Sequence, residues 1–286
     1  MPPTPVPPQQ PPDEERPGTL LESDEEIREA QKALKPGPAA TAAKQPPSRR
    51  PPANPYRPTV RPPMALLTVF DDGITEGQMI RVRGDRFIIG RSEGDLLISH
   101  DELISGRHVE ITRHRLGDKY RWVITDLQTR NGLFVRVSRT ALTDKSEFLV
   151  GSGRYRFEAA DSELPGTVDF LPAEAKPSST RHYGSGQTPV RQPVVVELVA
   201  GGIGARVPLV QPEHWIGSDP ACTICRADDP FVEPRHVRLS CASDNVWHAQ
   251  NNKTANGLWF KVPQITVEDG CLFQIGEQRF RLKVGG

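Results

Sequence analysis

Cysteine is scarce in this sequence, with four residues in 286. So few cysteines cannot build a disulfide scaffold, and we expect a reducing, cytoplasmic setting. Long apolar stretches are missing too: no run reaches 18 apolar residues, which argues against a membrane span or a membrane partner. Residues 1–12 are rich in Pro and Gln and lack the apolar core of a secretory signal.

Metal-ligand patterns are almost as scarce. Cys222 and Cys225 form one Cys-x-x-Cys pair, whereas Cys241 and Cys271 stand singly rather than as a second pair. If Cys222 and Cys225 lie on one strand, their side chains alternate to opposite faces. We therefore expect reduced, buried thiols, and we predict no metal and no cofactor.

An excess of charge of one sign is also absent. The whole chain carries 36 Lys and Arg against 36 Asp and Glu. The balance holds piecewise, with 15 basic against 14 acidic residues in 64–160, and 9 against 10 in 193–286. Nucleic-acid-binding domains usually carry a basic excess, so we predict no nucleic-acid partner. An anion recognised here would be small and held by a few placed residues.

Proline, in contrast, is concentrated at one end: residues 1–63 hold 18 of the 29 prolines. This stretch has almost no aromatic or β-branched residues to bury, so we expect a disordered tail. Within it, Ser23 and Glu26 have the Ser-x-x-Glu spacing of a capping box, followed by Ile27 on an apolar face. A helix over residues 24–35 would be either transient in a solvated tail or a short docking helix for a partner.

From residue 66 onward the pattern changes to short strand-like runs separated by Gly- and Asp-rich turns. Many short strands at close spacing, with no helical pattern between them, predict an all-β sandwich or barrel. Residues 161–192 are rich in Pro, Ser and Gly and are expected to be a linker. We therefore predict a domain at 64–160 and a second at 193–286.

The two blocks repeat the same anchors in the same order. Gly90-Arg91-Ser92 corresponds to Gly217-Ser218-Asp219, and Arg107-His108 corresponds to Arg235-His236. Residues 129–134 (Thr-Arg-Asn-Gly-Leu-Phe) correspond to 254–259 (Thr-Ala-Asn-Gly-Leu-Trp). The Gly-to-His separations are 18 (108 − 90) and 19 (236 − 217). The chain therefore contains two copies of one β-fold.

The order Gly-Arg-Ser, Ser-x-x-His and Thr-x-Asn-Gly resembles the forkhead-associated (FHA) domain. In this chain the motifs stand at 90–92, 105–108 and 129–132. The resemblance implies an eleven-stranded sandwich whose loops at one end bind phosphothreonine peptides. Residues 193–286 resemble the same fold with an altered motif, so the expected architecture is two FHA-type β-sandwiches in tandem.

Phosphothreonine offers three acceptor oxygens and about two negative charges, so its site needs a cation and several donors. Arg91 supplies a guanidinium, although a solvated surface arginine is the alternative. Ser105 supplies a hydroxyl, and Gly106 permits close backbone approach. Asn131 can donate to and accept from a peptide backbone. The further expected peptide-binding residues, Arg107 and Arg130, add charge at the loop rims.

A second set of motif residues is expected to be structural. His108 more plausibly holds neighbouring loops by hydrogen bonds than touches ligand, and Gly132 belongs to an Asn-Gly turn. The remaining members of this set are Gly90, Gly217, His236, Asn256 and Gly257.

The second copy lacks the phosphate donors: Ser218 stands in place of Arg91, and Glu233 in place of Ser105. A carboxylate there would repel a phosphate dianion and could pair with Arg235 instead. We expect the second domain to be a phosphate-independent packing or docking module.

No nucleophile elbow, Walker-type loop or His-Glu-x-x-His motif is present, so we expect no enzyme. The leading prediction is a phosphothreonine-dependent adaptor in Ser/Thr kinase signalling, with phosphothreonine-bearing proteins, a Ser/Thr kinase or its substrates as partners. The alternative is a scaffold that docks unmodified proteins on both β-domains. A third hypothesis has a phosphorylated tail threonine (Thr4, Thr19, Thr41 or Thr59) folding back onto the Arg91 site.

Overall fold

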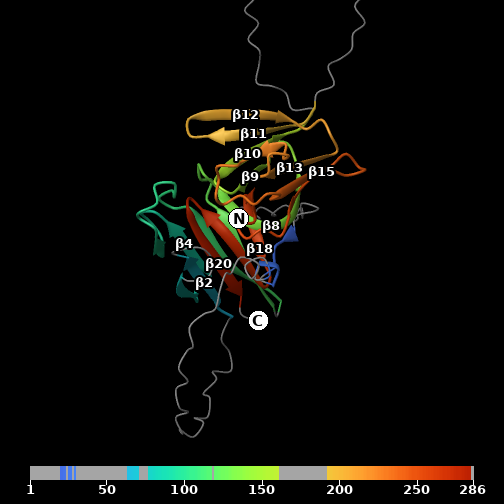
Figure 1. Cartoon of the computed structure of the whole chain (residues 1–286). Helices are drawn as coiled ribbons and strands as arrows, with labels where there is room; N and C mark the ends of the chain where they lie inside the picture. Colours follow the sequence, from blue (N-terminus) through green and yellow to red (C-terminus); the bar gives the residue numbers. More distant parts are fainter. Residues whose placement is uncertain are drawn as a thin grey trace, which may run out of the picture.

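The computed structural model describes residues 20–23, 25–27, 29, 63–70, 77–117, 119–160 and 192–284. Almost all regular structure in these residues is β, so the predicted all-β class is confirmed (Figure 1). The expected linker at 161–192, apart from residue 192, and most of the expected disordered tail, including its four threonines, lie outside the described residues.

The strands follow the turn signals of the sequence. The segment before the first repeat contributes β1 (Leu20–Leu21). The first repeat contributes β2 (Ala65–Phe70), β3 (Gly77–Val82), β4 (Arg86–Gly90), β5 (Leu96–Leu97), β6 (Val109–Leu116), β7 (Lys119–Asp126), β8 (Leu133–Leu142), β9 (Glu147–Val150) and β10 (Gly153–Glu158). The second contributes β11 (Val194–Val199), β12 (Gly202–Pro208), β13 (Glu213–Gly217), β14 (Ile224–Cys225), β15 (Val237–Cys241), β16 (Trp247–Asn251), β17 (Leu258–Val262), β18 (Gln264–Val267), β19 (Gly270–Ile275) and β20 (Gln278–Val284).

Strand pairing crosses between the repeats. β2, the first strand of repeat one, pairs antiparallel with β20, the last strand of repeat two, with Leu67 opposite Leu282. Conversely, β10 of repeat one pairs with β11 of repeat two, with Tyr155 opposite Glu197. β18 likewise adds to β7. Figure 1 shows β20 beside β2 in the lower half of the molecule and β10 beside β11 at the top.

Each sandwich is therefore built from both repeats, and this differs from two units confined to 64–160 and 193–286. The first sandwich comprises β2–β7, the start of β8 and β18–β20; the second comprises β11–β17, the end of β8, β9 and β10. Strand β8 connects them, because its beginning pairs with β19 of the first sandwich and its end with β16 of the second. Its ten residues include neither Gly nor Pro, so nothing in the strand turns the chain back.

One continuous hydrophobic core follows from this exchange. Phe148 of repeat one and Phe260 of repeat two are opposite each other on β9 and β17, and both are fully buried. Phe273 of β19 is opposite Val135 of β8, again across the repeats. The alternation of buried and less buried residues along β10 and β15 is the period-2 pattern that predicted strands.

Residues 20–29, expected within the disordered tail, instead pack on the body wherever they are described. Leu21 pairs with Val137 of β8, and residues 25–27 and 29 are helical. The capping box forms: Ser23 Oγ accepts the Glu26 N–H at 3.2 Å, and Glu26 accepts the Ser23 N–H at 2.8 Å. Of the two alternatives for the helix, the described residues agree with a docked one, since β8 supplies the partner that the local sequence lacks.

The cysteines are all free. Cys222 and Cys271 are buried, and burial raises the pKa of the Cys271 thiol to about 12, which keeps it protonated. Only Cys225 of the Cys-x-x-Cys pair lies on a strand, β14. The described part of the chain holds no group of three or more His, Cys, Asp or Glu arranged to bind a metal. None of its helices is long and apolar enough to cross a membrane.

Candidate phosphopeptide-binding site

Three loops meet at one end of the first sandwich, those following β4, β5 and β7. Backbone hydrogen bonds join the first two: the Arg91 N–H donates to Ser105 O at 2.9 Å, and the Ser92 N–H donates to Gly106 O at 3.3 Å. A Cβ on Gly90 would lie 2.1 Å from Gly106 O, so only glycine fits at this crossing. The structure thereby brings Arg91 and Ser105 together, as the motif predicted.

His108 joins the second loop to the third. Its Nδ1 accepts the Ser105 N–H at 3.1 Å, so Nε2 carries the proton and lies 3.2 Å from the acceptor Gly132 O. The side chain is fully buried, and burial lowers the pKa of His108 below its ordinary value. His108 is therefore a neutral link between loops.

The third loop is held by its own polar side chains. Thr129 Oγ1 donates to Asp126 at 2.6 Å and accepts the Gly132 N–H at 3.1 Å. Gly132 has a φ of 82°, a conformation that favours glycine. Asn131 donates its amide to Leu103 O at 2.7 Å, so the loop is docked on its neighbour. The side-chain carbonyl of Asn131 has no partner among the described residues and is available to a peptide N–H.

Three exposed arginines surround these loops: Arg91, Arg107 and Arg130. Within the described ranges, none of them forms an ion pair or a side-chain hydrogen bond. Two of the acidic residues near Arg91 in the sequence are engaged elsewhere, since Asp95 accepts the Ile88 N–H at 2.8 Å and Asp101 accepts the Leu103 N–H at 2.9 Å. The loop end therefore presents guanidinium groups whose hydrogen-bond donors are free to meet an anion.

The second repeat forms the same set of contacts between its loops, and this set is called the recognition frame below. The Ser218 N–H donates to Glu233 O at 3.0 Å, and the Glu233 N–H donates to His236 Nδ1 at 3.1 Å. His236 Nε2 lies 3.0 Å from Gly257 O, and Asn256 donates to Phe231 O at 3.0 Å. Burial also lowers the pKa of His236. A Cβ on the last expected structural residue, Gly217, would lie 2.0 Å from Pro234 O.

The groups presented on this second frame differ. The Glu233 carboxylate accepts the Ala255 N–H at 2.8 Å, so an acceptor bridges the two loops where the first repeat offers a hydroxyl. Arg235 does not pair with Glu233, as was considered from the sequence; its guanidinium lies 5.5 Å from the Trp215 ring centroid. In the second repeat a carboxylate therefore joins two of the loops to each other.

Sequence reasoning missed two aspartates that anchor the loops to the exchanged hairpins. Asp101 accepts the Glu277 N–H of the β19–β20 turn at 2.7 Å. Asp229 accepts the Ser152 N–H of the β9–β10 turn at 2.8 Å. A signal was present, because each aspartate lies four positions before the aligned residue, Ser105 or Glu233 (105 − 101 and 233 − 229). Each recognition loop is therefore supported by the other repeat.

The first sandwich thus has a loop end that carries Gly-Arg-Ser, Ser-x-x-His and Asn-Gly. The family model "FHA domain" matches residues 87–151 and 214–276. Each repeat therefore contains a match to the FHA domain family, whose members are phosphothreonine-binding interaction modules.

Two solved structures are similar to parts of the chain. Full-length yeast Pml1p is 19% identical over 26% of this chain and 58% of its own length, with a TM-score of 0.24. Mycobacterium tuberculosis EmbR, solved in complex with a low affinity phosphopeptide, is 24% identical over 33% of this chain and 24% of its own length, with a TM-score of 0.21. The chain thus spans only part of either protein. No curated protein matches it.

Proposed function

We propose that this protein is a phosphothreonine-dependent adaptor in which the first loop set, and not the second, binds the phosphate. The observation that carries the proposal is Arg91, whose backbone N–H donates to Ser105 O while its guanidinium has no partner among the described residues. Two nearby carboxylates, those of Asp95 and Asp101, are engaged by backbone N–H groups. Gly106, Arg107 and Arg130 extend the donor surface, and Asn131 clamps the peptide backbone. Its partners are phosphothreonine-bearing proteins in the cytoplasm, a Ser/Thr kinase or its substrates among them.

The second loop set supports the docking or packing role. Ser218 provides no cation, and the Glu233 carboxylate already holds the Ala255 N–H, so a phosphate would meet negative charge and an occupied donor. The backbone contacts of a recognition surface are retained here, but the negative charge of Glu233 disfavours a phosphate dianion.

The test is titration of the full chain with a phosphothreonine peptide library, followed by the Arg91→Ala variant. Losing one charge-assisted hydrogen bond of about 1.5–3 kcal/mol should weaken binding by roughly 10- to 150-fold. Arg83→Ala is the matched control, because Arg83 is also exposed and follows β3, at the opposite end of β4 from Arg91. It should bind as the unmodified chain does.

Equal affinity of Arg91→Ala and the unmodified chain would refute the site. Partner capture that is indifferent to phosphatase treatment would favour the alternative, a scaffold for unmodified proteins.

A further inference from the structure

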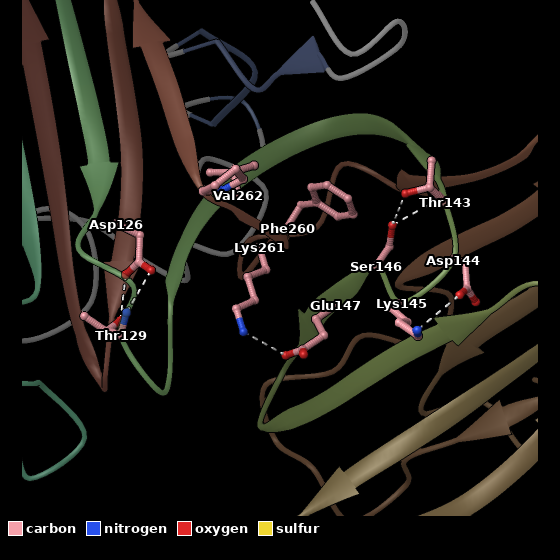
Figure 2. Close-up of a pocket in the computed structure, with 11 residues that line it drawn as sticks. Asp126, Thr129, Thr143, Asp144, Lys145, Ser146, Glu147, Phe260, Lys261 and Val262 are labelled. Carbon is pink, nitrogen blue, oxygen red and sulfur yellow. Dashed lines mark hydrogen bonds and ion pairs between the residues drawn. The ribbon is translucent and has the colours of Figure 1, made fainter. Parts of the chain in front are cut away.

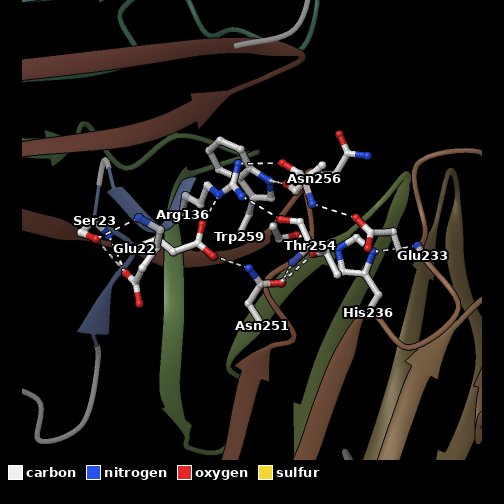
Figure 3. A network of polar contacts seen from close by, with 12 residues as sticks. Glu22, Ser23, Arg136, Glu233, His236, Asn251, Thr254, Asn256 and Trp259 are labelled. Carbon is white, nitrogen blue, oxygen red and sulfur yellow. Dashed lines mark hydrogen bonds and ion pairs between the residues drawn. The ribbon is translucent and has the colours of Figure 1, made fainter. Parts of the chain in front are cut away.

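A buried ion pair joins the segment before the first repeat to the body of the protein. The Glu22 carboxylate contacts the guanidinium of Arg136 on β8, and the two side chains are 4% and 1% exposed. Asn251, at the end of β16, donates its amide to the same carboxylate. Figure 3 shows Glu22 reaching in from the side of β1 to meet these partners.

Arg136 links this contact to the second recognition frame. Its Nη1 and Nη2 donate to the carbonyl oxygens of Ala255 and Thr254, each at 2.9 Å. A Cβ on Gly257 would lie 2.4 Å from Arg136 Nε, so the loop rests directly on the guanidinium. Glu22 is the only carboxylate that contacts Arg136 among the described residues. Without it, a charge would be left buried and unpaired.

Besides the ion pair of Glu22, the same segment makes an apolar contact through Ile27. Ile27, one helical turn beyond Ser23, is 1% exposed and packs in a small cluster apart from the main core. The other buried members are Phe70, Phe134, Trp259 and Leu272. These residues come from both repeats, so Ile27 packs in a cluster that neither repeat forms alone. The Arg136 groove denotes this cluster together with Arg136 and Asn251. The described residues 20–23, 25–27 and 29 are called the anchor segment below.

The corresponding place in the other half of the molecule is a useful comparison. Lys261 there aligns with Arg136, and a Cβ on Gly132 would lie 2.3 Å from Lys261 Cε. The carboxylate that meets Lys261 is Glu147 of the body, at 3.4 Å. Figure 2 shows this pair beside an open depression of about 420 Å³ lined by Asp126 and Thr129.

The repeat alignment explains why, among the described residues, a segment packs beside Arg136 and none packs beside Lys261. Leu272 aligns with Glu147, so the position that supplies a carboxylate to Lys261 is apolar on the Arg136 side. Asn251 aligns with Asp126, which places an amide donor instead of a negative charge beside the incoming residue. The Arg136 side thus lacks the carboxylate that meets Lys261 in the other half, and Arg136 and Asn251 present donors to an incoming one.

We infer that the groove around Arg136 is a second peptide-binding site, independent of phosphate, and that its ligand is the anchor segment of the same chain. Recognition uses an acidic residue, Glu22, against Arg136 and Asn251, and an aliphatic residue, Ile27, five positions later in the apolar cluster. Pairing of Leu20 and Leu21 with β8 sets the register. Because Arg136 holds the loop at 254–257, occupancy of the groove supports the second recognition frame.

The experiment cuts the connection between ligand and groove in the folded full chain. A specific protease sequence replaces residues 44–50, and the protein is cleaved and passed through gel filtration. We expect the fragment carrying the anchor segment to stay with the body. Glu22→Gln and Ile27→Asp should weaken this retention at least about 100-fold, since each leaves a buried group unpaired. Glu25→Gln and Glu29→Gln, which change exposed residues of the same helix, should not.

A second measurement leaves the body unaltered. A labelled peptide of residues 18–34 should exchange into the cleaved wild-type complex, and the same peptide with Glu22→Gln should not. Immediate loss of the wild-type fragment, or equal exchange of both peptides, would overturn the inference. A dimer of the uncut chain that excess peptide dissociates would place the segment on a second copy and overturn the assignment within one chain. Phosphothreonine peptide titration of the same samples reports separately on the Arg91 site.

Discussion

At the scale of single residues, the same backbone frame carries different chemistry in its two copies. Arg91 and Ser218 each donate a backbone N–H to the aligned loop residue, at 2.9 and 3.0 Å. The frame therefore holds these positions whatever the side chain, and phosphate recognition depends on which groups extend from it. Where the first repeat has the guanidinium of Arg91, the second has the hydroxyl of Ser218 and so lacks a positive charge. Where the first repeat has the hydroxyl of Ser105, the second has the carboxylate of Glu233, whose negative charge repels phosphate.

The neutral histidines predict a dependence of stability on pH. Burial lowers the pKa of both His108 and His236 below the ordinary value of about 6.5. The folded protein consequently binds fewer protons than the unfolded chain below that pH, so the free energy of unfolding falls as the pH drops. The urea midpoint should be lower at pH 5.5 than at pH 7.5, a window above the ordinary titration of carboxylates.

The prediction is checked by urea unfolding across this range, together with NMR of the imidazole nitrogens. At pH 7.5 both rings should show the neutral form protonated at Nε2. A constant midpoint, or charged rings at pH 6.5, would contradict the role of His108 and His236 as neutral links.

At the scale of elements, the recognition loops depend on hairpins contributed by the opposite repeat. Asp229 receives the Ser152 N–H at 2.8 Å, the Ser152 Oγ–H at 2.6 Å and the Phe231 N–H at 3.0 Å. Burial alone would raise the pKa of Asp229, but these hydrogen bonds and the charge of Arg226 lower it. Asp229 therefore functions as a carboxylate that ties the second recognition loop to the β9–β10 turn.

Asp229→Ala should accordingly destabilise the protein by about 1–3 kcal/mol, because buried N–H groups lose their acceptor. Asp228→Ala is the control, since Asp228 is the exposed neighbour. Urea unfolding of the two variants measures the difference. If both variants unfold at the same urea concentration, Asp229 does not support the exchanged hairpin.

At the scale of the whole molecule, the exchange of strands makes the two repeats one folding unit. The beginning of β8 lies in one sandwich and its end in the other, and each sandwich is completed by the other repeat's last strands. A contact between β2 and β20 is impossible if each repeat closes on itself, since β2 would then pair with β10. This gives a direct chemical test.

Leu66 and Lys283 are opposite each other on β2 and β20. The double variant Leu66→Cys/Lys283→Cys should form an intramolecular disulfide under mild oxidation, because the Cα atoms of facing strand residues lie within the usual disulfide range. Peptide mapping of the monomer identifies the bond. Leu66→Cys alone, in the presence of the four native cysteines, is the control.

Failure of the double variant to cross-link would show that the repeats close separately. A disulfide found only between two chains would show that the exchange takes place between molecules.

Much of this protein could be predicted from local sequence. Alternating apolar residues and Gly/Asp turns predicted the strands, and the repeated motif spacing predicted two copies of one FHA-type frame. The loop contacts of Gly90, His108 and Asn131 follow from short-range motif chemistry. The capping box of Ser23 and Glu26 was also visible, because it involves residues three positions apart.

Only the tertiary structure decided which strand completes which sandwich and where the anchor segment lies. A strand edge recognises backbone groups and the period-2 alternation of side chains, and the two repeats share both, so β10 and β20 would suit either sandwich by local criteria. The choice depends on long-range terms: the uninterrupted course of β8, the cross-repeat anchors Asp101 and Asp229, and the charge of Arg136, which is met by Glu22 more than a hundred positions away.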